Sequence, residues 1–324
     1  MQNYLYCLDE NYNIQGSISI FSLLSKSSET VNIYILHKNP SSFEKYLKII
    51  STKLKNVNFF IYKFDKTGVN FPNIKDSHVS EATYYRFFID EFLPADLKEV
   101  MYIDADIVCM KSLINSYRKE IKKLKESDFI ISAKTEFSND EELYGYHDEF
   151  NRLEMKGSKY FNAGVMFIDL EKWRKARIQN KLLDKQNTLN RKIQLWDQDV
   201  LNSYFDGKYI ELDKYLNYVV NIWIYIKDFN HSEDISPKEI SNIYLLHYAG
   251  KSKPWTVKGA IHPTSDIYQE GYRKLFNKKY HIDSNWKIIG VVDFISLLTS
   301  KYFFKVKYKF SYIFHVLKYL FSKQ

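Results

Sequence analysis

Strand-like and helix-like segments alternate through the first half of the chain, and this alternation constrains the fold more than any other feature. Short runs rich in β-branched and aromatic residues predict strands at 4–9, 31–37, 57–64, 99–109 and 128–134. Amphipathic segments predict helices between them at 14–27, 41–54, 80–93 and 113–126. Because strands that alternate with helices pair through helical crossovers, the sequence predicts an α/β fold with a mainly parallel central sheet flanked by helices.

The second half is less regular, and it ends in a segment of different character. Here the patterns predict a strand running into a helix at 165–174, a helix at 197–205 and strands at 209–213 and 242–249. From about residue 286 the pattern is helical, first apolar and then basic and aromatic. A length of 324 residues suits one large domain or two modest ones. We therefore expect a main domain at 1–285 and a helical C-terminal segment at 286–324.

Cysteine usage and hydropathy bear on the compartment. Cys7 and Cys109 lie inside apolar strand-like runs, so we expect buried free thiols rather than a disulfide, as in a reducing compartment. The N-terminus has no basic stretch followed by an apolar one, so no signal peptide is expected. No uninterrupted apolar run approaches the ~18 residues of a spanning helix. These features predict a cytoplasmic location.

Positive charge is concentrated at the C-terminus. The net charge is +8, and no acidic residue follows Asp293. Lysines alternate there with aromatic residues, a composition that suits an anionic membrane surface or nucleic acid. If the segment is helical, Lys301, Lys305 and Lys309 form one basic stripe. We predict peripheral docking on the inner leaflet of a bacterial membrane, and the alternative is a helix packed on the main domain.

Two carboxylates lie within the predicted strand at 99–109. Asp104 and Asp106 are two residues apart, so in a strand they share one face and repel each other. Such a pair of hard oxygen ligands suits a divalent cation. His247 ends another apolar strand and could complete the site. One imidazole with carboxylates fits Mn²⁺ and tolerates Mg²⁺, and the absence of cysteine ligands argues against structural zinc.

Several polar residues stand beside predicted strands or inside apolar helices. Lys253, beyond Gly250, could offer a point charge to a phosphate oxygen or be a solvated surface lysine. Asn162 suits either a turn or a hydrogen bond to a polyhydroxylated ligand. Asp197 could cap the following helix or, with Gln198, lie next to a reacting carbon. Arg86, in an apolar helix, requires a salt bridge or an anionic ligand.

Segments with these residues, taken in order, resemble glycosyltransferase family 8. The resemblance rests on CLDENY, EATYYRFFIDEFLP, YIDADIVC, YFNAGVMFIDLEKWR, LWDQDVLN and HYAGKSKPW, from about residue 4 to 255. Members of this family are retaining, metal-dependent enzymes with a GT-A fold, and they include bacterial lipopolysaccharide galactosyl- and glucosyltransferases. The resemblance implies a GT-A catalytic domain at 1–285.

The resemblance also implies roles for individual residues. A divalent ion, Mn²⁺ or Mg²⁺, would be held by Asp104, Asp106 and His247. The donor nucleotide and diphosphate would contact Asp9, Asn11, Tyr12, Arg86, Asp104, Ala105, Asp106, Gly250 and Lys253, with Tyr12 stacking on uracil. The transferred sugar would be surrounded by Asn162, Asp197 and Gln198, with the Gln198 amide close to the anomeric carbon.

The activity implied is transfer of galactose or glucose from a UDP-sugar to a glycan or lipid-linked acceptor in bacterial surface polysaccharide or lipopolysaccharide synthesis, with no nucleic acid partner. Loops at 137–160 and 225–240 would shape the acceptor site. The family often has an aspartate that contacts donor-sugar hydroxyls after the strand at 128–134, whereas this chain has Glu136 nearby. The donor sugar therefore stays open.

The sequence leaves both the mechanism and the class of function open. Gln198 is a poor nucleophile, which favours front-face transfer, while Asp197 remains a possible nucleophile for double displacement. A nucleotidyltransferase would also use paired aspartates with a divalent cation. A non-catalytic basic protein that binds membranes or nucleic acid would explain the C-terminal segment, but it would not explain the carboxylates or the HYAGKSKPW segment.

Overall fold

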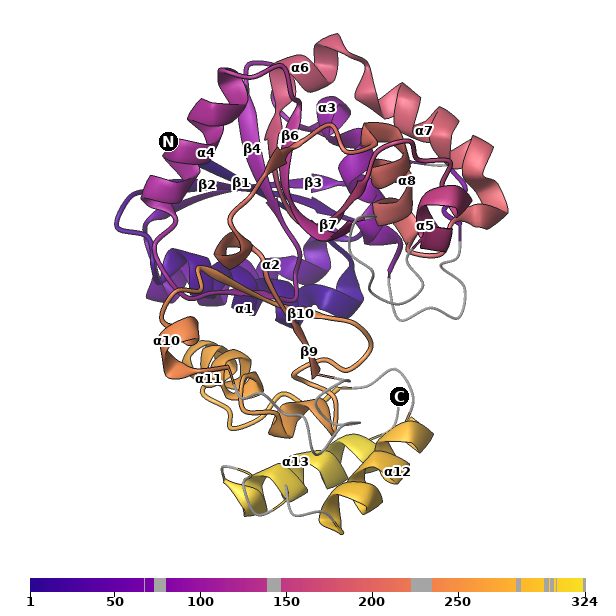
Figure 1. Cartoon of the computed structure of the whole chain (residues 1–324). Coiled ribbons are helices and arrows are strands. Elements are labelled where there is room, and N and C mark those ends of the chain that lie inside the picture. The colour runs from indigo at the N-terminus through magenta and orange to yellow at the C-terminus, as the bar shows by residue number, and fades with distance from the viewer. Residues whose placement is uncertain are drawn as a thin grey trace.

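Two β-sheets form the framework of the protein (Figure 1). The computed structural model describes residues 1–324 except 67, 73–79, 139–146, 223–234, 284–286, 300–302, 304–305, 307 and 323–324. Much of the two loops expected to shape the acceptor site, 137–160 and 225–240, lies outside the described residues.

The larger sheet has seven strands in the order β3-β2-β1-β4-β7-β6-β8. Its strands are β1 Gln2–Leu8, β2 Val31–His37, β3 Val57–Lys63, β4 Glu99–Ile103, β6 Ile131–Ser138, β7 Lys159–Asp169 and β8 Ile210–Glu211. All neighbours pair in parallel except those of β7, which is antiparallel to both β4 and β6. The mainly parallel sheet is thus confirmed.

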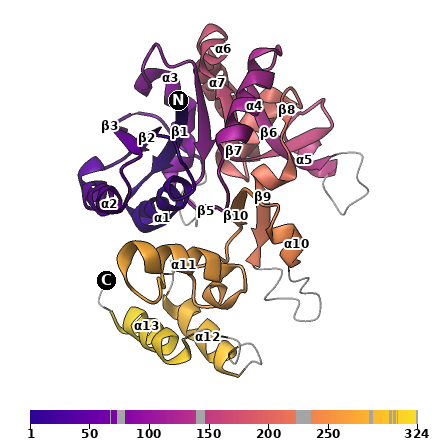
Figure 2. The ribbon, with the colours of Figure 1, turned by 90° about the vertical axis from the view of Figure 1, so that its left-hand side faces the viewer.

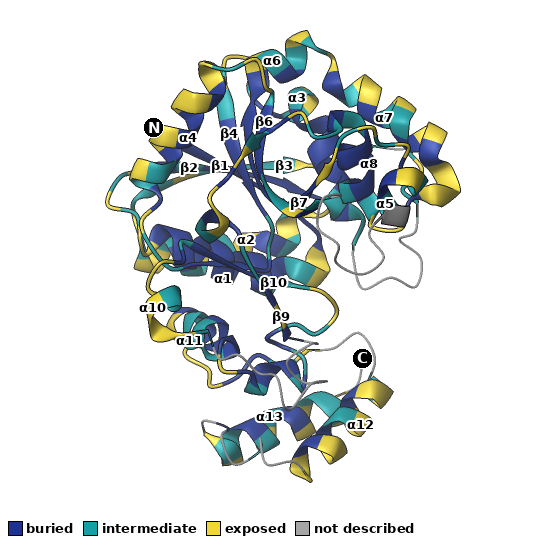
Figure 3. Ribbon diagram, in the orientation of Figure 1, coloured by how far each residue is buried: buried dark blue, intermediate teal, exposed yellow. Residues whose placement is uncertain are grey.

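Burial along the strands explains their places in this sheet. Every residue of β1 is buried, as expected for a central strand covered on both faces. Its side chains alternate between two cores: Tyr4 and Tyr6 enter one, while Leu5 and Cys7 enter the other. The edge strand β3 has no buried residue. Figure 3 shows the same gradient from buried central strands to exposed helix surfaces.

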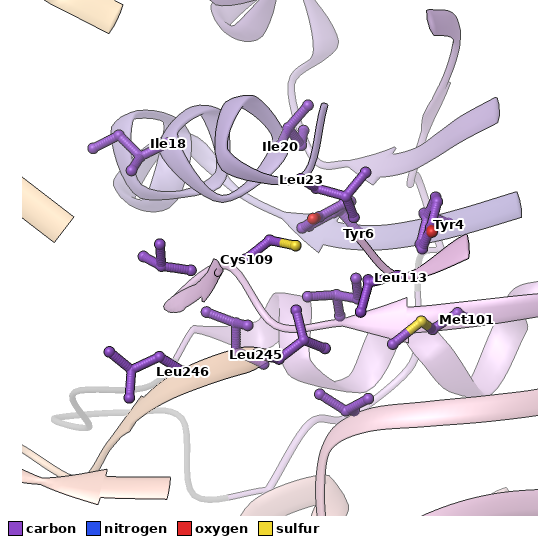
Figure 4. Close-up of a cluster of buried hydrophobic side chains, with 14 of the residues drawn as sticks. Tyr4, Tyr6, Ile18, Ile20, Leu23, Met101, Cys109, Leu113, Leu245 and Leu246 are labelled. Carbon is purple, nitrogen blue, oxygen red and sulfur yellow. The ribbon is translucent and has the colours of Figure 1, made fainter. Parts of the chain in front are cut away.

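Helices cover both faces of the sheet. The first face is covered by α1 Asn13–Leu24, α2 Pro40–Lys53 and α4 Ile114–Lys125, whose apolar residues join one core cluster. Figure 4 shows Ile18, Ile20 and Leu23 of α1 in this cluster. The second face is covered by the 3₁₀ helix η2 Glu81–Phe88 and by α3 Ile89–Phe92, α6 Leu170–Lys175, α7 Ile178–Leu189 and α8 Trp196–Phe205. Cys7 and Cys109 are buried free thiols, as predicted.

A smaller sheet, ordered β5-β10-β9, corrects one prediction. Its strands are β5 Ile107–Cys109, β10 Leu245–Ala249 and β9 Tyr218–Asn221. The continuous strand expected at 99–109 is wrong, because β4 ends at Ile103 and β5 belongs to the second sheet. Between them the Asp104 N–H donates to the Gly164 carbonyl and the Ile107 N–H to the Asp104 carbonyl, which closes a turn. The two carboxylates therefore do not share a strand face.

Short 3₁₀ helices connect these layers, and further α-helices complete the fold. The 3₁₀ helices are η1 Glu10–Tyr12, η3 Asn190–Lys192, η4 Lys214–Leu216 and η5 Gly259–Ile261. The remaining helices are α5 His147–Arg152, α10 Pro237–Ile240, α11 Ser265–Phe276, α12 Lys287–Leu298 and α13 Lys309–Phe321. The helix expected at 80–93 is mostly the 3₁₀ helix η2, with only its last turn α-helical.

The C-terminal helices α12 and α13 build a small core of their own beside α11 (Figure 2). Phe294, Tyr312 and Val316 from these helices pack with Val257 and Tyr280 of the preceding chain. The Tyr312 hydroxyl donates to the Val257 carbonyl over 2.6 Å. This packing agrees with the alternative reading of the segment, and the division at residue 285 stays a prediction. No helix among the described residues has the length and apolar character needed to cross a bilayer.

Candidate active site

A cavity of about 560 Å³ lies where β1 and β4 end, and β10, α8 and η2 enclose it. Of the predicted site residues, the structure brings together Tyr12, Arg86, Asp104, Ala105, Asp106, Asn162, Asp197, Gln198, His247, Gly250 and Lys253 in its lining. Carboxyl ends of parallel strands are where ligands bind in open α/β sheets, so the location agrees with the predicted crevice.

Asp9 and Asn11 are the predicted site residues that do not line this cavity. Asp9 follows β1 and caps η1: its carboxylate accepts a hydrogen bond from the Asn11 backbone N–H over 3.0 Å. Burial raises the pKa of Asp9, and its hydrogen bonds to Asn11 lower it again in part. The same short helix carries Tyr12, whose ring meets Trp255 edge-on. Asp9 therefore orients the turn that places Tyr12 in the cavity wall.

Asp104, Asp106 and His247 form the candidate cation site. One ligand atom from each lies within 4.8 Å of the others, and Asp106 and His247 are buried. Within the described chain, Asp106 Oδ1 is a buried atom that accepts no hydrogen bond. A buried carboxylate oxygen without a donor is costly unless a cation satisfies it. Two carboxylates and one imidazole thus fit Mn²⁺ or Mg²⁺ in ligand type and in spacing.

His247 is held on both sides of its ring. Its Nε2 lies 3.4 Å from Asp106 Oδ1, and its Nδ1 lies 3.0 Å from the side-chain oxygen of Asn217. The ring also packs against the backbone of Gly164, because a Cβ built there would lie 2.4 Å from His247 Cε1. A residue larger than glycine at 164 would therefore push the imidazole from its place.

Lys253 pairs with one of the candidate cation ligands. Its ammonium donates to Asp106 Oδ2 over 2.6 Å and to the Tyr248 carbonyl over 2.7 Å. Burial alone would raise the pKa of Asp106, but the Lys253 and His247 side chains hold it well below the ordinary value. Asp106 is therefore a carboxylate at neutral pH. Gly250 bends the loop towards Lys253 with φ +80°, a conformation that favours glycine.

Arg86 lies at the floor of the cavity, with only 2% of its side chain exposed. Its Nη2 is 2.9 Å from Asp104 Oδ1, and its Nε is 3.0 Å from Asp197 Oδ2. The guanidinium also stacks on the Tyr102 ring, 3.8 Å from the ring centre, and donates to the Ala163 carbonyl. Of the two possibilities that the sequence left open, the structure shows the salt bridge.

Amide and carboxyl groups meet on the far side of the cavity. The Gln198 side-chain oxygen accepts the Ala163 N–H over 2.9 Å, while its Nε2 donates to Glu136 over 3.1 Å. Asn162 Nδ2 lies 3.4 Å from the same carboxylate. Asp197 accepts a hydrogen bond from the Thr83 hydroxyl. Burial raises the pKa of Asp197 to about 6, although Arg86 and Thr83 oppose that rise.

The reading of Asp197 as a helix cap is wrong, because another aspartate holds the start of α8. Asp199 is fully buried and accepts the Gln194 and Leu195 N–H groups as well as a hydrogen bond from Tyr160. Between these anchors Trp196 adopts φ +50°. This strained turn directs Asp197 and Gln198 into the cavity.

Sequence reasoning missed Thr83, Tyr102, Asp199 and Asn217. Thr83 precedes Arg86 by three residues on η2, and this spacing is the signal that could have placed the two side chains on one face. Tyr102 precedes Asp104 by two, and its hydroxyl donates to Asp104 over 2.5 Å. Asp199 belongs to the LWDQDVLN segment, but the sequence does not distinguish its role from that of Asp197. Asn217 stands in a connection with no recognisable motif, and only the fold brings it to His247.

Comparisons with known proteins agree with this geometry. The family model described as "Glycosyl transferase family 8" matches residues 3–259, which is well over half of the chain. Glycosyltransferase GlyF of Streptococcus pneumoniae is 30% identical over 251 residues, which are 76% of this chain and 55% of that protein. This chain thus matches just over half the length of that relative.

Two further relatives match over most of both chains. Lipopolysaccharide 1,2-glucosyltransferase of Escherichia coli K12 is 26% identical over 90% of this chain and 82% of its own. Lipopolysaccharide 1,3-galactosyltransferase of Salmonella typhimurium is 27% identical over 82% of this chain and 76% of its own.

Solved structures confirm the fold prediction. The galactosyltransferase LgtC, crystallised with donor and acceptor sugar analogues, has a TM-score of 0.62 at 22% identity and covers 85% of this chain and 96% of its own. An active-site mutant of LgtC gives a TM-score of 0.64 at 23% identity over 84% of this chain and 96% of its own. The catalytic fold is thus of the GT-A type. Because the family model covers residues 3–259 and the predicted motifs meet in one cavity, the chain belongs to glycosyl transferase family 8, a family of glycosyltransferases.

Proposed function

We propose that this protein is a metal-dependent, retaining hexosyltransferase that moves galactose or glucose from a UDP-sugar to a glycan or lipid-linked acceptor. One observation carries the proposal: the candidate cation site, the half-buried Lys253 and the Gln198–Glu136 amide and carboxyl pair face the same cavity. These groups match the parts of a nucleotide-sugar, namely a diphosphate and a polyhydroxylated ring. The names of the E. coli and Salmonella relatives support a hexose donor and a lipopolysaccharide acceptor.

The donor diphosphate would lie between the cation site and Lys253. A divalent cation held by Asp104, Asp106 and His247 would supply Lewis acidity that stabilises charge on the leaving diphosphate. Lys253 would move its ammonium from Asp106 to a phosphate oxygen, over a short distance and without proton transfer. Tyr12 would stack on the uracil at the adjoining end of the cavity, with Asp9 and Asn11 orienting its turn from outside the lining. Gly250 would contact the diphosphate.

Geometry at the sugar end favours front-face transfer. The Gln198 amide oxygen is a poor nucleophile, and it already accepts the Ala163 N–H. Asp197 Oδ1 accepts from the Thr83 hydroxyl, and Oδ2 lies 3.0 Å from the buried Arg86 guanidinium. Neither side chain therefore presents a strong, unengaged nucleophile. The acceptor hydroxyl would attack from the side of the leaving group as the bond to the diphosphate breaks, and its proton would pass to a donor phosphate oxygen. Trapping a covalent glycosyl adduct on Asp197 would overturn this choice of mechanism.

Glu136 is our candidate for recognition of the donor sugar. Its carboxylate lies against the amides of Gln198 and Asn162, where the sugar ring would be. It would take the place of the family's aspartate towards sugar hydroxyls. Because two hexoses that differ at one hydroxyl are separated by the partners of that hydroxyl, Glu136→Ala should change the ratio of UDP-galactose to UDP-glucose turnover.

A donor screen tests the proposed reaction. The full chain is incubated with Mn²⁺ and a panel of nucleotide-sugars, and free nucleotide is measured with and without EDTA. We expect UDP release from one UDP-hexose, with loss of turnover in EDTA and in Asp106→Asn, while an exposed control such as Asp96→Asn stays active. Pyrophosphate release would identify a nucleotidyltransferase instead. Turnover that is indifferent to EDTA would refute the metal-dependent mechanism.

We further propose that the C-terminal helices dock on an anionic membrane surface. On α12 the exposed residues Ile288, Val292 and Ile295 recur at helical spacing, and on α13 Phe310 and Phe314 are 91% and 62% exposed. Lysine side chains nearby would favour anionic lipid. Lys309 begins α13, whereas Lys301 and Lys305 of the predicted basic stripe lie outside the described residues.

Liposome flotation tests the membrane proposal. Deleting the segment would expose the small core around Tyr312, so substitutions at the surface are the sharper variants. The double variant Phe310→Ser and Phe314→Ser should lose binding to liposomes rich in anionic lipid and keep UDP-sugar turnover. Phe129→Ser, an exposed aromatic remote from these helices, is the control. Flotation that does not change in the double variant would refute the proposal, and the protein would then act away from the membrane.

A further inference from the structure

Asn217 lies behind His247, outside the cavity and outside every motif that suggested the function. It is completely buried and follows η4, where its backbone N–H donates to the Lys214 carbonyl. Its side chain bridges two residues, His247 on one side and Asn162 on the other. A buried amide that satisfies both its oxygen and its nitrogen in this way fixes the orientation of its neighbours.

The hydrogen bonds assign every atom along this bridge. Asn162 Oδ1 accepts the Gly164 backbone N–H over 3.0 Å, so the oxygen of Asn162 must face that way. Asn217 lies 2.9 Å from the same oxygen and must therefore donate with its Nδ2. Its own oxygen then faces His247 Nδ1 at 3.0 Å. An amide oxygen only accepts, so the proton of a neutral His247 belongs on Nδ1.

We infer that Asn217 is a positioning residue that keeps His247 in the Nδ1–H tautomer and so leaves the Nε2 lone pair for the cation. The inference rests on the metal site of the proposed function and deepens it. Nε2 is the ring nitrogen that points to Asp106, 3.4 Å from Oδ1. Metal-bound histidines commonly donate their other N–H to an oxygen, which fixes the tautomer and the ring orientation.

Asp106 makes this control necessary. By itself, the carboxylate next to Nε2 would favour a proton on Nε2, where it would block coordination. Asn217 opposes that choice from the other side of the ring. Gly164 closes the remaining direction, since its backbone lies against the imidazole and leaves no room for a side chain. The ring is therefore fixed in tautomer by one neighbour and in position by another.

Nuclear magnetic resonance reads the tautomer directly. The full chain, labelled with ¹⁵N-histidine, is studied at pH 8 without metal, where an ordinary imidazole is neutral. His247 is assigned by the loss of its signals in His247→Gln. Because Nε2 couples to both carbon-bound ring protons and Nδ1 strongly to only one, the protonated nitrogen can be identified. We expect the proton on Nδ1 in the wild type and a shift of the proton towards Nε2 in Asn217→Leu.

Metal affinity provides the second readout. Free Mn²⁺ is followed by electron paramagnetic resonance during titration of the wild type, Asn217→Leu and Asn217→Asp. We expect about 10- to 100-fold weaker binding by Asn217→Leu. Asn217→Asp keeps an oxygen that accepts from Nδ1 but loses the donor to Asn162, so it should bind more tightly than Asn217→Leu and more weakly than the wild type. Gln186→Leu, which removes a buried amide from α7 remote from the site, should leave the affinity unchanged and controls for destabilisation.

The outcomes separate this inference from the proposal beneath it. A wild-type His247 protonated on Nε2, or equal Mn²⁺ affinities of the wild type and Asn217→Leu, would overturn the role of Asn217 alone. If the wild type binds no Mn²⁺ at all, the metal site of the proposed function fails as well. Circular dichroism of each variant establishes that a change in affinity does not come from unfolding.

Discussion

Lys253 and Asp106 form an ion pair of 2.6 Å, although the sequence assigned the first to a diphosphate and the second to a cation. Lys253 binds Asp106 Oδ2 and a cation would bind the unpartnered Oδ1, so the two positive charges share one carboxylate unless Lys253 moves to the diphosphate. A cation on Asp106 and an ammonium on the same carboxylate repel each other, while a diphosphate attracts both. The pair therefore couples the binding of metal to the binding of the nucleotide, and such coupling is reciprocal.

Lys253→Met should accordingly change the two affinities in opposite directions. Without the ammonium, Asp106 is a buried carboxylate that lacks its partner, so Mn²⁺ alone should bind more tightly. UDP should bind about 10- to 150-fold more weakly, because a hydrogen bond between charged groups contributes roughly 1.5–3 kcal/mol. Calorimetric titrations with each ligand alone measure both effects, and Lys48→Met on the surface of α2 is the control. Unchanged Mn²⁺ affinity would contradict the coupling of metal and nucleotide through the Lys253–Asp106 pair.

Arg86 lies between the metal end and the sugar end of the cavity, and replacing it should strongly lower the free energy of unfolding. It pairs with Asp104 and Asp197 from a fully buried position. Arg86→Gln leaves Asp197 buried without its cation, which typically costs about 3–5 kcal/mol. Urea denaturation should show that loss. The exposed Arg118–Glu29 pair provides the comparison, since Arg118→Gln should cost less than about 1 kcal/mol. Equal effects of the two substitutions would show that Arg86 is not a structural cation.

Sequence reasoning reached the fold because local patterns decide it. The strand–helix alternation at 31–63 and the apolar run at 4–8 left little choice but a parallel sheet. It failed at Asp104, where strand periodicity was extended through a turn that only the contact with Gly164 creates. It also missed Asn217, since a lone asparagine carries no pattern until tertiary structure sets it behind His247. Residues that act through another side chain are the part of the site that composition and spacing hide.

Asp197 gives the protein a specific dependence on pH. Burial raises its pKa from 3.8 to about 6 in the folded protein, and Arg86 only partly offsets this. Between pH 4 and 6 the folded state thus binds more protons than the unfolded state, so Asp197 makes the fold less stable as pH rises through that window. Relative to Asp197→Asn, the wild type should lose up to roughly 3 kcal/mol over this range.

Denaturation of both proteins at several pH values between 4 and 7 checks this sign. Other carboxyl groups contribute equally to the two curves and cancel in the difference. The difference should fall as pH increases and become level above about pH 6. A difference that rises with pH would mean that the Arg86 ion pair outweighs burial and that the folded pKa of Asp197 is below its ordinary value.

Gly164 is the last position at which the geometry makes a sharp demand. A Cβ there would lie 2.4 Å from His247 Cε1 and 2.8 Å from Nδ1, closer than nonbonded atoms approach. Gly164→Ala must therefore displace the imidazole, which weakens Mn²⁺ binding by at least about tenfold and destabilises the fold by about 1–3 kcal/mol. Titration with Mn²⁺ and urea denaturation measure these two losses.

A double-mutant cycle shows whether the clash with His247 is the cause of that instability. In a His247→Ala background the added methyl group has room, so Gly164→Ala should cost much less stability than it does in the wild type. Neighbouring residues that share a contact are expected to be non-additive in this way. Additive losses would mean that Gly164 is required by its backbone or by Asn162, 3.0 Å from the same Cβ, rather than by the histidine.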